Sequence, residues 1–102
     1  MSLADLDALI HAPKRLAAMA LLANSEAVEF AFLRDHLEVK DADLSKQMKA
    51  LVEAGYVSTR KSKVGRGGKR WFRITAEGRT AFDQHVSALR SIVATADSEV
   101  LS

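Results

Sequence analysis

The stretch STRKSKVGRGGKRWFRIT, residues 58–75, restricts the fold of this 102-residue chain more than any other part of it. It holds seven of the fifteen Lys and Arg residues, and no Asp or Glu lies between Glu53 and Glu77. On both sides of the central VGRGG, β-branched and aromatic residues roughly alternate with polar ones, which is typical of strands. Glycine tolerates positive φ, so the sequence predicts two strands joined by a basic glycine loop.

The residues before this stretch follow helical spacing instead. Apolar residues recur three or four apart, which predicts helices over 1–12, 13–24, 29–38 and 42–54. Pro13 separates the first two, because the residue before a proline avoids helical geometry and proline suits the first turn of a helix. Val28 is expected to form a brief strand. Asp41 is expected to cap the 42–54 helix and Gly55 to terminate it.

After the basic stretch the helical period returns. Thr75 is placed to cap a final helix over 76–102, and Gly78 in its first turn indicates a close approach by another element. The apolar stripe of this helix follows a heptad pattern for about two and a half heptads. Phe82 is expected to pack on the chain's own core, whereas the rest of the stripe and the N-terminal helix are expected to face a second subunit. The expected interface residues are Leu6, Leu9, Ile10, Val86, Leu89, Val93, Ala96 and Val100.

The length predicts one domain. Its expected parts are an N-terminal helix over 1–12, a winged core over 13–75 and a C-terminal dimerisation helix over 76–102. The expected fold class is mainly α with a small β-hairpin wing, an α+β arrangement. Two short helices joined by a tight turn, followed by the hairpin, predict a winged helix-turn-helix with N- and C-terminal helices for dimerisation.

Several classes of function find no support. The absence of cysteine excludes disulfides and thiolate metal sites. The three histidines lack ligand-like spacing, so no metal and no cofactor is predicted, although His85 borders the expected dimer seam and could respond to pH. No nucleophile elbow, phosphate loop or metal motif is present, so the chain is not expected to be an enzyme. Neither a signal peptide nor a membrane span is apparent, which indicates a cytoplasmic protein.

The basic stretch and the 42–54 helix together indicate a polyanionic partner. With the apolar stripe of this helix turned inward, Lys46 points outward among small and polar residues, which suits entry into a major groove. Cations of the wing can bind phosphates and release condensed counterions. Asp43 either complements the helix N-terminus or accepts from a cytosine amino group. Trp71 either packs under the wing or meets DNA.

The segment LSKQMKALVEAGYV, followed by GRGGKRWFRITAEGR, resembles winged-helix transcriptional regulators of the broad MarR, PadR and ArsR type. The resemblance implies a homodimer that binds pseudo-palindromic operators in double-stranded DNA. It places Ser45, Lys46 and Gln47 where the recognition helix touches DNA, with Lys49 one turn further on and Arg66 at the wing tip. The cysteine or histidine metal sensors of many ArsR proteins are missing, so no effector is predicted.

The predicted function is therefore sequence-specific DNA binding by a transcriptional regulator, expected to be a repressor, through the 42–54 helix and the 62–69 wing. The expected DNA-contacting residues are Ser45, Lys46, Gln47, Lys49, Arg60, Lys63, Arg66, Lys69, Arg70 and Arg73. Two alternatives stay open. One is a winged helix that binds an acidic protein surface and no DNA, and the other is a winged helix that binds RNA.

Overall fold

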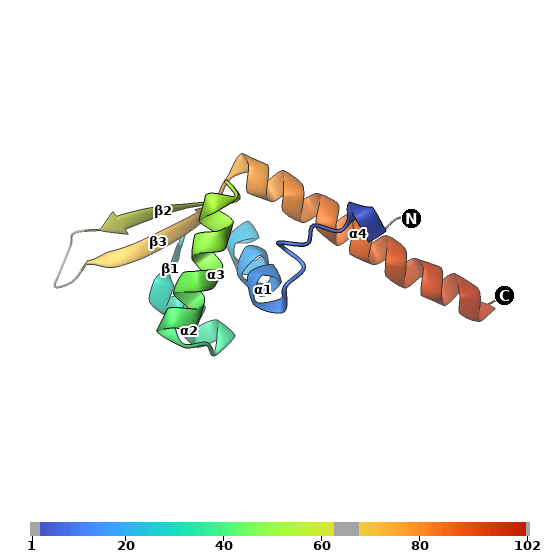
Figure 1. Ribbon diagram of the computed structural model, residues 1–102, viewed down its shortest axis with the longest axis horizontal. Coiled ribbons are helices and arrows are strands. Elements are labelled where there is room, and N and C mark those ends of the chain that lie inside the picture. Colours follow the sequence, from blue (N-terminus) through green and yellow to red (C-terminus); the bar gives the residue numbers. More distant parts are fainter. Residues whose placement is uncertain (1–2, 63–67, 102) are drawn as a thin grey trace.

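The computed structural model describes residues 3–62 and 68–101, with side chains described as far as residue 95. The three strands form an antiparallel sheet in the order β1-β3-β2. Helices α1, α2 and α3 gather on one side of this sheet, and α4 leads away from it (Figure 1). The elements are η1 (Leu3–Asp5), α1 (Pro13–Ala23), β1 (Val28–Glu29), α2 (Phe30–Leu37), α3 (Asp41–Glu53), β2 (Val57–Ser62), β3 (Lys69–Ile74) and α4 (Ala76–Leu101). The expected α+β fold with a hairpin wing is confirmed.

The core lies between the three short helices and the inner face of the sheet. On the strands, Val57, Phe72 and Ile74 are buried, and the residues between them along β3 point to the opposite face. The helices supply side chains that are almost fully excluded from water, namely Met19, Leu22, Leu33, Leu44, Met48 and Leu51. Each such burial stabilises the fold by about 1.5–3 kcal/mol. Phe82 of α4 packs against this core, as expected.

The turn between α2 and α3 is tight because Glu38 adopts a left-handed conformation with φ of 55°. The N–H of Val39 then donates to the carbonyl of Arg34, 3.2 Å away, and closes the end of α2. Lys40 is the residue before α3, so Asp41 is its first helical residue and not the cap expected from the sequence. The short connection fixes α3 against α2 in a helix-turn-helix.

The end of α3, the base of the wing and the start of α4 are bonded together at one point. Gly55 has φ of 81°, and the N–H groups of Gly55 and Tyr56 donate to the carbonyls of Val52 and Leu51, a Schellman ending. The N–H of Thr75 donates to the carbonyl of Tyr56 at 3.0 Å, and its hydroxyl donates to the carbonyl of Gly55 at 2.6 Å.

The same hydroxyl of Thr75 accepts from the N–H of Gly78 at 2.9 Å, which caps α4 as predicted. The first turn of α4 lies so close to Tyr56 that a Cβ on Gly78 would stand 2.0 Å from the Tyr56 carbonyl oxygen. The close approach expected at this glycine is therefore confirmed. These contacts fix the base of the wing, because β2 begins directly after Tyr56 and β3 ends directly before Thr75.

The expected helix over 1–12 is wrong for residues 3–12. Only Leu3–Asp5 forms a short 3₁₀ turn. The carboxylate of Asp7 accepts from the N–H groups of Leu9 and Ile10 at 2.9 and 3.1 Å, and such side-chain bonds compete with helical backbone bonds. The resulting bend inserts Ile10, which is 0% exposed, into the chain's own core, so its expected place in a dimer interface is also wrong.

A polar network ties this N-terminal segment to α4. The backbone N–H of Asp7 donates to Nδ1 of His85, 2.9 Å away, and His85 is fully buried. The proton of the neutral ring therefore sits on Nε2, which lies 3.3 Å from Nδ1 of His11. The hydroxyl of Tyr56 donates to the Asp7 carboxylate at 2.6 Å. This bond and the two backbone bonds outweigh burial, so the pKa of Asp7 lies below its ordinary value.

Helix α4 spans 26 residues, about 39 Å at 1.5 Å per residue, and extends beyond the body of the molecule (Figure 1). Along its expected interface stripe, Val86 and Leu89 are half-buried and Val93 is 61% exposed. Leu6 and Leu9 are half-buried in the N-terminal segment. The side chains of Ala96 and Val100 lie outside the described residues. No helix among the described residues is long and apolar enough to cross a membrane.

We expect Gly78→Ala to destabilise the protein by about 1–3 kcal/mol, because the new Cβ would meet the Tyr56 carbonyl. An unobstructed Gly-to-Ala change inside a helix would instead stabilise by about 1 kcal/mol. Urea unfolding followed by circular dichroism measures the difference. The control Thr80→Ala, exposed in the next turn, should change stability by less than about 0.5 kcal/mol. A stabilised Gly78→Ala would contradict the close approach.

We also expect stability to fall as the pH drops below about 6.5. Burial lowers the pKa of His85 from its ordinary 6.5 and the neighbouring His11 lowers it further, against the opposing charge of Asp7. The unfolded chain then binds the His85 proton at a higher pH than the native protein does. Stability present above pH 6.5 is consequently lost as the pH falls toward the native pKa.

Urea unfolding at a series of pH values from neutral to about 5.5 tests this dependence. His85→Gln retains an acceptor for the Asp7 N–H but cannot titrate, so its stability should change less over this range. His36→Gln removes an exposed histidine of α2 and should leave the dependence intact. If the His85→Gln profile matched that of the unaltered protein, another group would be responsible.

Candidate nucleic-acid interface

The outward face of α3 has the composition expected from the sequence. Leu44, Met48 and Leu51 are buried, which turns Lys46 and Lys49 to solvent on the other side. Ser45 is half-buried near the start of the helix. Among the described residues, Lys46 makes no ion pair, whereas Lys49 lies 3.9 Å from Glu53 with both side chains largely exposed. An exposed pair of this kind contributes little, so both lysines can reach a ligand.

The acidic residues at the start of α3 are paired within the domain. Asp41 accepts from Arg34 of α2 at 3.1 Å. Asp43 forms an ion pair with Lys14 of α1 and also accepts from Gln47 at 3.0 Å. The hydrogen bonds from Lys14 and Gln47 hold the pKa of Asp43 below its ordinary value. Asp43 therefore joins α1 to α3 in this structure. This favours a structural role over the alternative, in which Asp43 accepts a hydrogen bond from a cytosine amino group.

Gln47 belongs to the same junction. Its side-chain oxygen accepts from the guanidinium of Arg15 at 2.6 Å, while Arg15 also donates to the carbonyl of Leu9 at 2.6 Å. The half-buried Gln47 thus has partners on both sides, unlike Lys46. Its predicted contact with DNA would require it to share or exchange these bonds. Sequence reasoning did not assign Lys14 and Arg15 to this junction, because contacts between α1 and α3 leave no local signal.

A cleft of about 410 Å³ separates the start of α3 from the wing. Ser45 and Asp41 line it from α3, Glu29 lines it from β1, and Lys61, Lys69 and Arg70 line it from β2 and β3. Lys61 and Arg70 are opposite each other in the register of β2 and β3, so they share one face of the hairpin. Among the described residues, these three cations form no ion pair with an acidic side chain.

Lys61 was missing from the expected contacts. Its register partner Arg70 was among them, but the two faces of a hairpin can be assigned only once the pairing of the strands is known.

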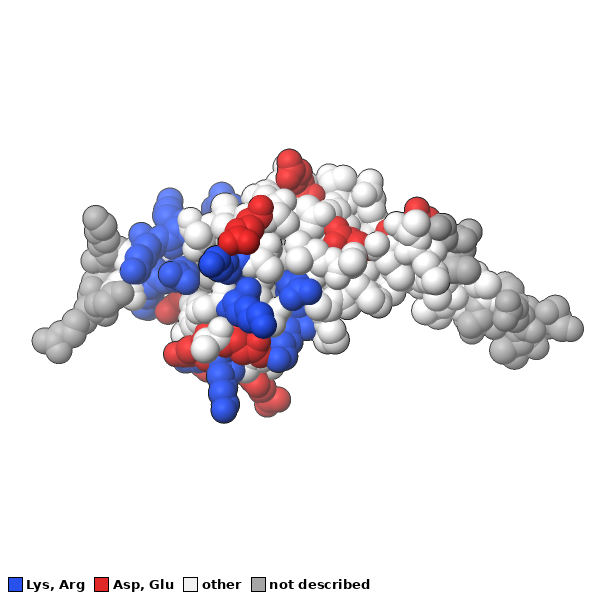
Figure 2. All heavy atoms as spheres, viewed as in Figure 1, with Lys and Arg blue, Asp and Glu red and all other residues white. Residues whose placement is uncertain are grey.

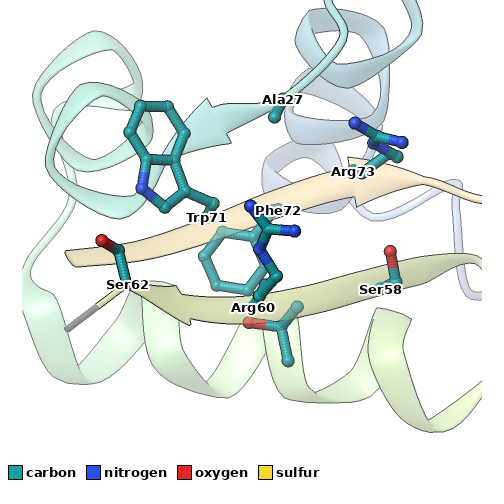
Figure 3. A pocket seen from close by; sticks show the side chains of 8 residues that line it. Ala27, Ser58, Arg60, Ser62, Trp71, Phe72 and Arg73 are labelled. Carbon is teal, nitrogen blue, oxygen red and sulfur yellow. The ribbon is translucent and has the colours of Figure 1, made fainter.

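The remaining strand cations lie on the other face of the sheet. Arg60 pairs in register with Trp71, and Ser58 pairs with Arg73. These four residues line a groove of about 600 Å³ on the outer face, away from the core (Figure 3). Trp71 is half-buried and stands on this outer face, so the first of its two expected places, packing under the wing, is wrong. The expected contacts Lys63 and Arg66 lie outside the described residues.

Basic side chains are concentrated at one end of the molecule. Figure 2 shows Lys and Arg gathered over the wing strands and over the region of α3, with acidic side chains among them and below them. The net charge of only +2 therefore conceals a strong local asymmetry. A duplex, with a dense row of phosphates, would be attracted to this end of the molecule. No group of three or more His, Asp or Glu side chains suited to a metal occurs within the described part of the chain.

A family model described as a winged helix DNA-binding domain matches residues 14–93. The chain belongs to this family. It is also 36% identical over 72 residues to the uncharacterized protein MJ0432 of Methanocaldococcus jannaschii, covering 71% of this chain and 78% of that protein. The family confirms the resemblance to small winged-helix regulators that the sequence indicated.

Solved structures share the fold at lower identity. A transcriptional regulator homologue from Pyrococcus horikoshii OT3 superposes with a TM-score of 0.83 at 22% identity, covering 87% of this chain and 88% of that one. NadR, in complex with 4-hydroxyphenylacetate, superposes with a TM-score of 0.72 at 20% identity, covering 97% of this chain and 69% of that one. At these identities the likeness establishes the winged-helix fold.

Proposed function

We propose that the protein is a sequence-specific DNA-binding transcriptional regulator that acts as a homodimer, with repression as its mode of action. The observation that carries the proposal is that two sets of exposed cations lie on neighbouring elements. Lys46 and Lys49 are exposed on the outward face of α3, and Lys61 and Arg70 of the wing line the cleft that Ser45 of α3 also lines. Membership of a DNA-binding family supports the same partner.

In this mechanism α3 enters a major groove. Lys46 and Ser45 face base edges, and Lys49 meets a phosphate beside the groove. Lys61, Lys69 and Arg70 hold phosphates on the far side of the cleft. The ion pairs of Asp41 and Asp43 with α2 and α1 offset the two negative charges that would otherwise repel the duplex at the start of α3.

Two copies of the chain would pair along α4. Its stripe leaves Val93 61% exposed, far from the core, and Leu3 of the adjoining N-terminal turn is 72% exposed. Such apolar side chains along a projecting helix are typical of an interface that is covered in the assembled protein. The two α3 helices of the dimer would then enter successive major grooves about 34 Å apart, on a pseudo-palindromic operator.

Replacing Arg70 by Gln should weaken binding to all duplex sequences to a similar degree. In a dimer the change removes two phosphate contacts, so the slope of log affinity against log salt should become shallower by about 2. Fluorescence anisotropy with a labelled duplex at several salt concentrations measures the slope. Arg90→Gln is the matched control, since it removes the same charge from an exposed position on α4 and should leave the slope unchanged.

Lys46→Gln, assayed in parallel, should change the preference among duplex sequences, because Lys46 faces base edges in this mechanism. Equal losses on every sequence would make Lys46 a phosphate contact only. If the unaltered protein failed to bind any duplex at low salt, the proposed function would be wrong. A winged helix that binds an acidic protein surface would then be the better description.

Val93→Glu should convert the dimer into a monomer, because it places a charge at the exposed apolar position of the α4 stripe. Val93 is 61% exposed in the single chain, so the change should not disturb the protomer's own core. Light scattering after size-exclusion chromatography gives the mass. Ser91→Glu, exposed on roughly the opposite side of α4, should leave the dimer intact. Persistence of the Val93→Glu dimer would exclude this face as the seam.

A further inference from the structure

The outer face of the sheet carries a second arrangement of cations that the cleft beside α3 does not use. A groove of about 600 Å³ runs over β2 and β3 and is lined there by Ser58, Arg60, Ser62, Trp71 and Arg73. Figure 3 shows the labelled side chains of Trp71, Arg60 and Arg73 standing on this face. The core and α3 lie on the other side of the sheet, so a duplex in the cleft would leave this groove open.

The register of the strands places an aromatic ring in one row across the sheet and a guanidinium with a hydroxyl in the next row on the same face. Trp71 lies between Glu29 of β1 and Arg60 of β2, and two residues further along β3 Arg73 lies opposite Ser58. Residues two apart on one strand are about 7 Å apart. The flat ring of Trp71 is thus followed, two residues along β3, by a row with a guanidinium and a hydroxyl, whereas Glu29 lies in the same row as the ring. This separation is comparable to that between the base and the phosphate of a nucleotide.

Arg73 is already held in position. Its Nε donates to the backbone carbonyl of Glu26 at 3.1 Å, and within the described residues its terminal nitrogens make no other hydrogen bond. Arg60 is exposed and forms no ion pair with an acidic side chain in that same part of the chain. Guanidinium groups bind phosphate through two parallel N–H donors, and a guanidinium held in advance loses less entropy on doing so.

The small exposed apolar area of the groove distinguishes between two kinds of anionic ligand, an acidic protein surface and a small molecule with a planar group. Trp71 is the one large apolar side chain that the groove exposes among its described lining residues, since Phe72 points to the core and is 2% exposed. A protein interface would need a broader apolar centre around such an anchor. A single flat ring beside two arginines instead suits a ligand that has one planar group and one anionic group.

We propose that this outer face binds a nucleotide, with an unstacked base against Trp71 and its phosphate held by Arg60 and Arg73. Bases stack on aromatic side chains without strong sequence preference, and the neighbouring cations follow the phosphates. The nucleotide is either free or part of an unpaired strand. This site is separate from the duplex-binding cleft and does not depend on it.

Trp71 makes the proposal directly measurable, because it is the only tryptophan in the chain. Its fluorescence should be quenched saturably by adenosine monophosphate or by single-stranded oligoadenylate. Adenosine, which lacks the phosphate, should bind at least about tenfold more weakly, as expected when a charge-assisted hydrogen bond is lost. Saturation by the mononucleotide identifies a free nucleotide as sufficient, and saturation by the oligonucleotide alone identifies a strand.

Neighbouring residues on β2 give the matched variants, because Arg60 and Lys61 point to opposite faces of the sheet. Arg60→Gln should weaken quenching by the best of these ligands about tenfold or more and leave duplex affinity nearly unchanged. Lys61→Gln should do the reverse. Trp71→Leu, assayed by anisotropy of the labelled oligonucleotide, should lose single-strand binding while circular dichroism remains native.

Three results would overturn the proposal. The first is the absence of saturable quenching by both the mononucleotide and the oligonucleotide. The second is equal quenching by polyglutamate, which would indicate an acidic protein partner. The third is quenching by duplex alone, with equal losses in Arg60→Gln and Lys61→Gln, which would mean that both faces contact one duplex. A failure of the duplex-binding cleft, in contrast, would leave the quenching by single strands unaffected.

Discussion

The geometry of this protein depends on one close contact between the C-terminal turn of α3 and the first turn of α4. The Tyr56 carbonyl accepts from the N–H of Thr75, and the hydroxyl of Thr75 bonds both the Gly55 carbonyl and the N–H of Gly78. Only the absence of a side chain at Gly78 allows the two backbones to approach so closely. Because β2 begins directly after this point and β3 ends directly before it, the contact fixes the wing relative to α3.

The close contact between Tyr56 and Gly78 is also linked by hydrogen bonds to the N-terminal segment and to His85 of α4. Tyr56, which lies within it, donates its hydroxyl to Asp7, and the backbone of Asp7 in turn bonds the buried His85 of α4. The N-terminal segment, the base of the wing and α4 therefore share one hydrogen-bonded network. Networks of this kind stabilise strongly when every member has its partners, and in the described part of the chain no buried side-chain N or O atom lacks one.

The charges are divided between the two faces of the wing by the alternation of the strands. Lys61 and Arg70 face the cleft beside α3, whereas Arg60 and Arg73 face the outer groove with Trp71. One basic run in the sequence thus supplies two surfaces with different shapes and different neighbours. The acidic residues at the start of α3 do not neutralise the cations that face the cleft, because Asp41 and Asp43 form ion pairs with Arg34 and Lys14.

The sequence by itself determined the local elements. Pro13, the left-handed Gly55 and the cap at Thr75 set the boundaries of α1, α3 and α4, since these signals act on the backbone of the residues next to them. Spacing alone also determined that Lys46 points outward. The sequence could not show that Asp7 would take the N–H groups of its neighbours and bend residues 3–12 away from a helix, because that bend also requires His85 and the core site for Ile10.

Only the tertiary structure decided the hydrogen-bond partners of Gln47 and the faces of the sheet on which Arg60 and Lys61 lie. These depend on which strand pairs with which, in what register, and on how α1 packs against α3. Such choices are made by contacts between residues that are distant in the sequence, so no local pattern of residues records them.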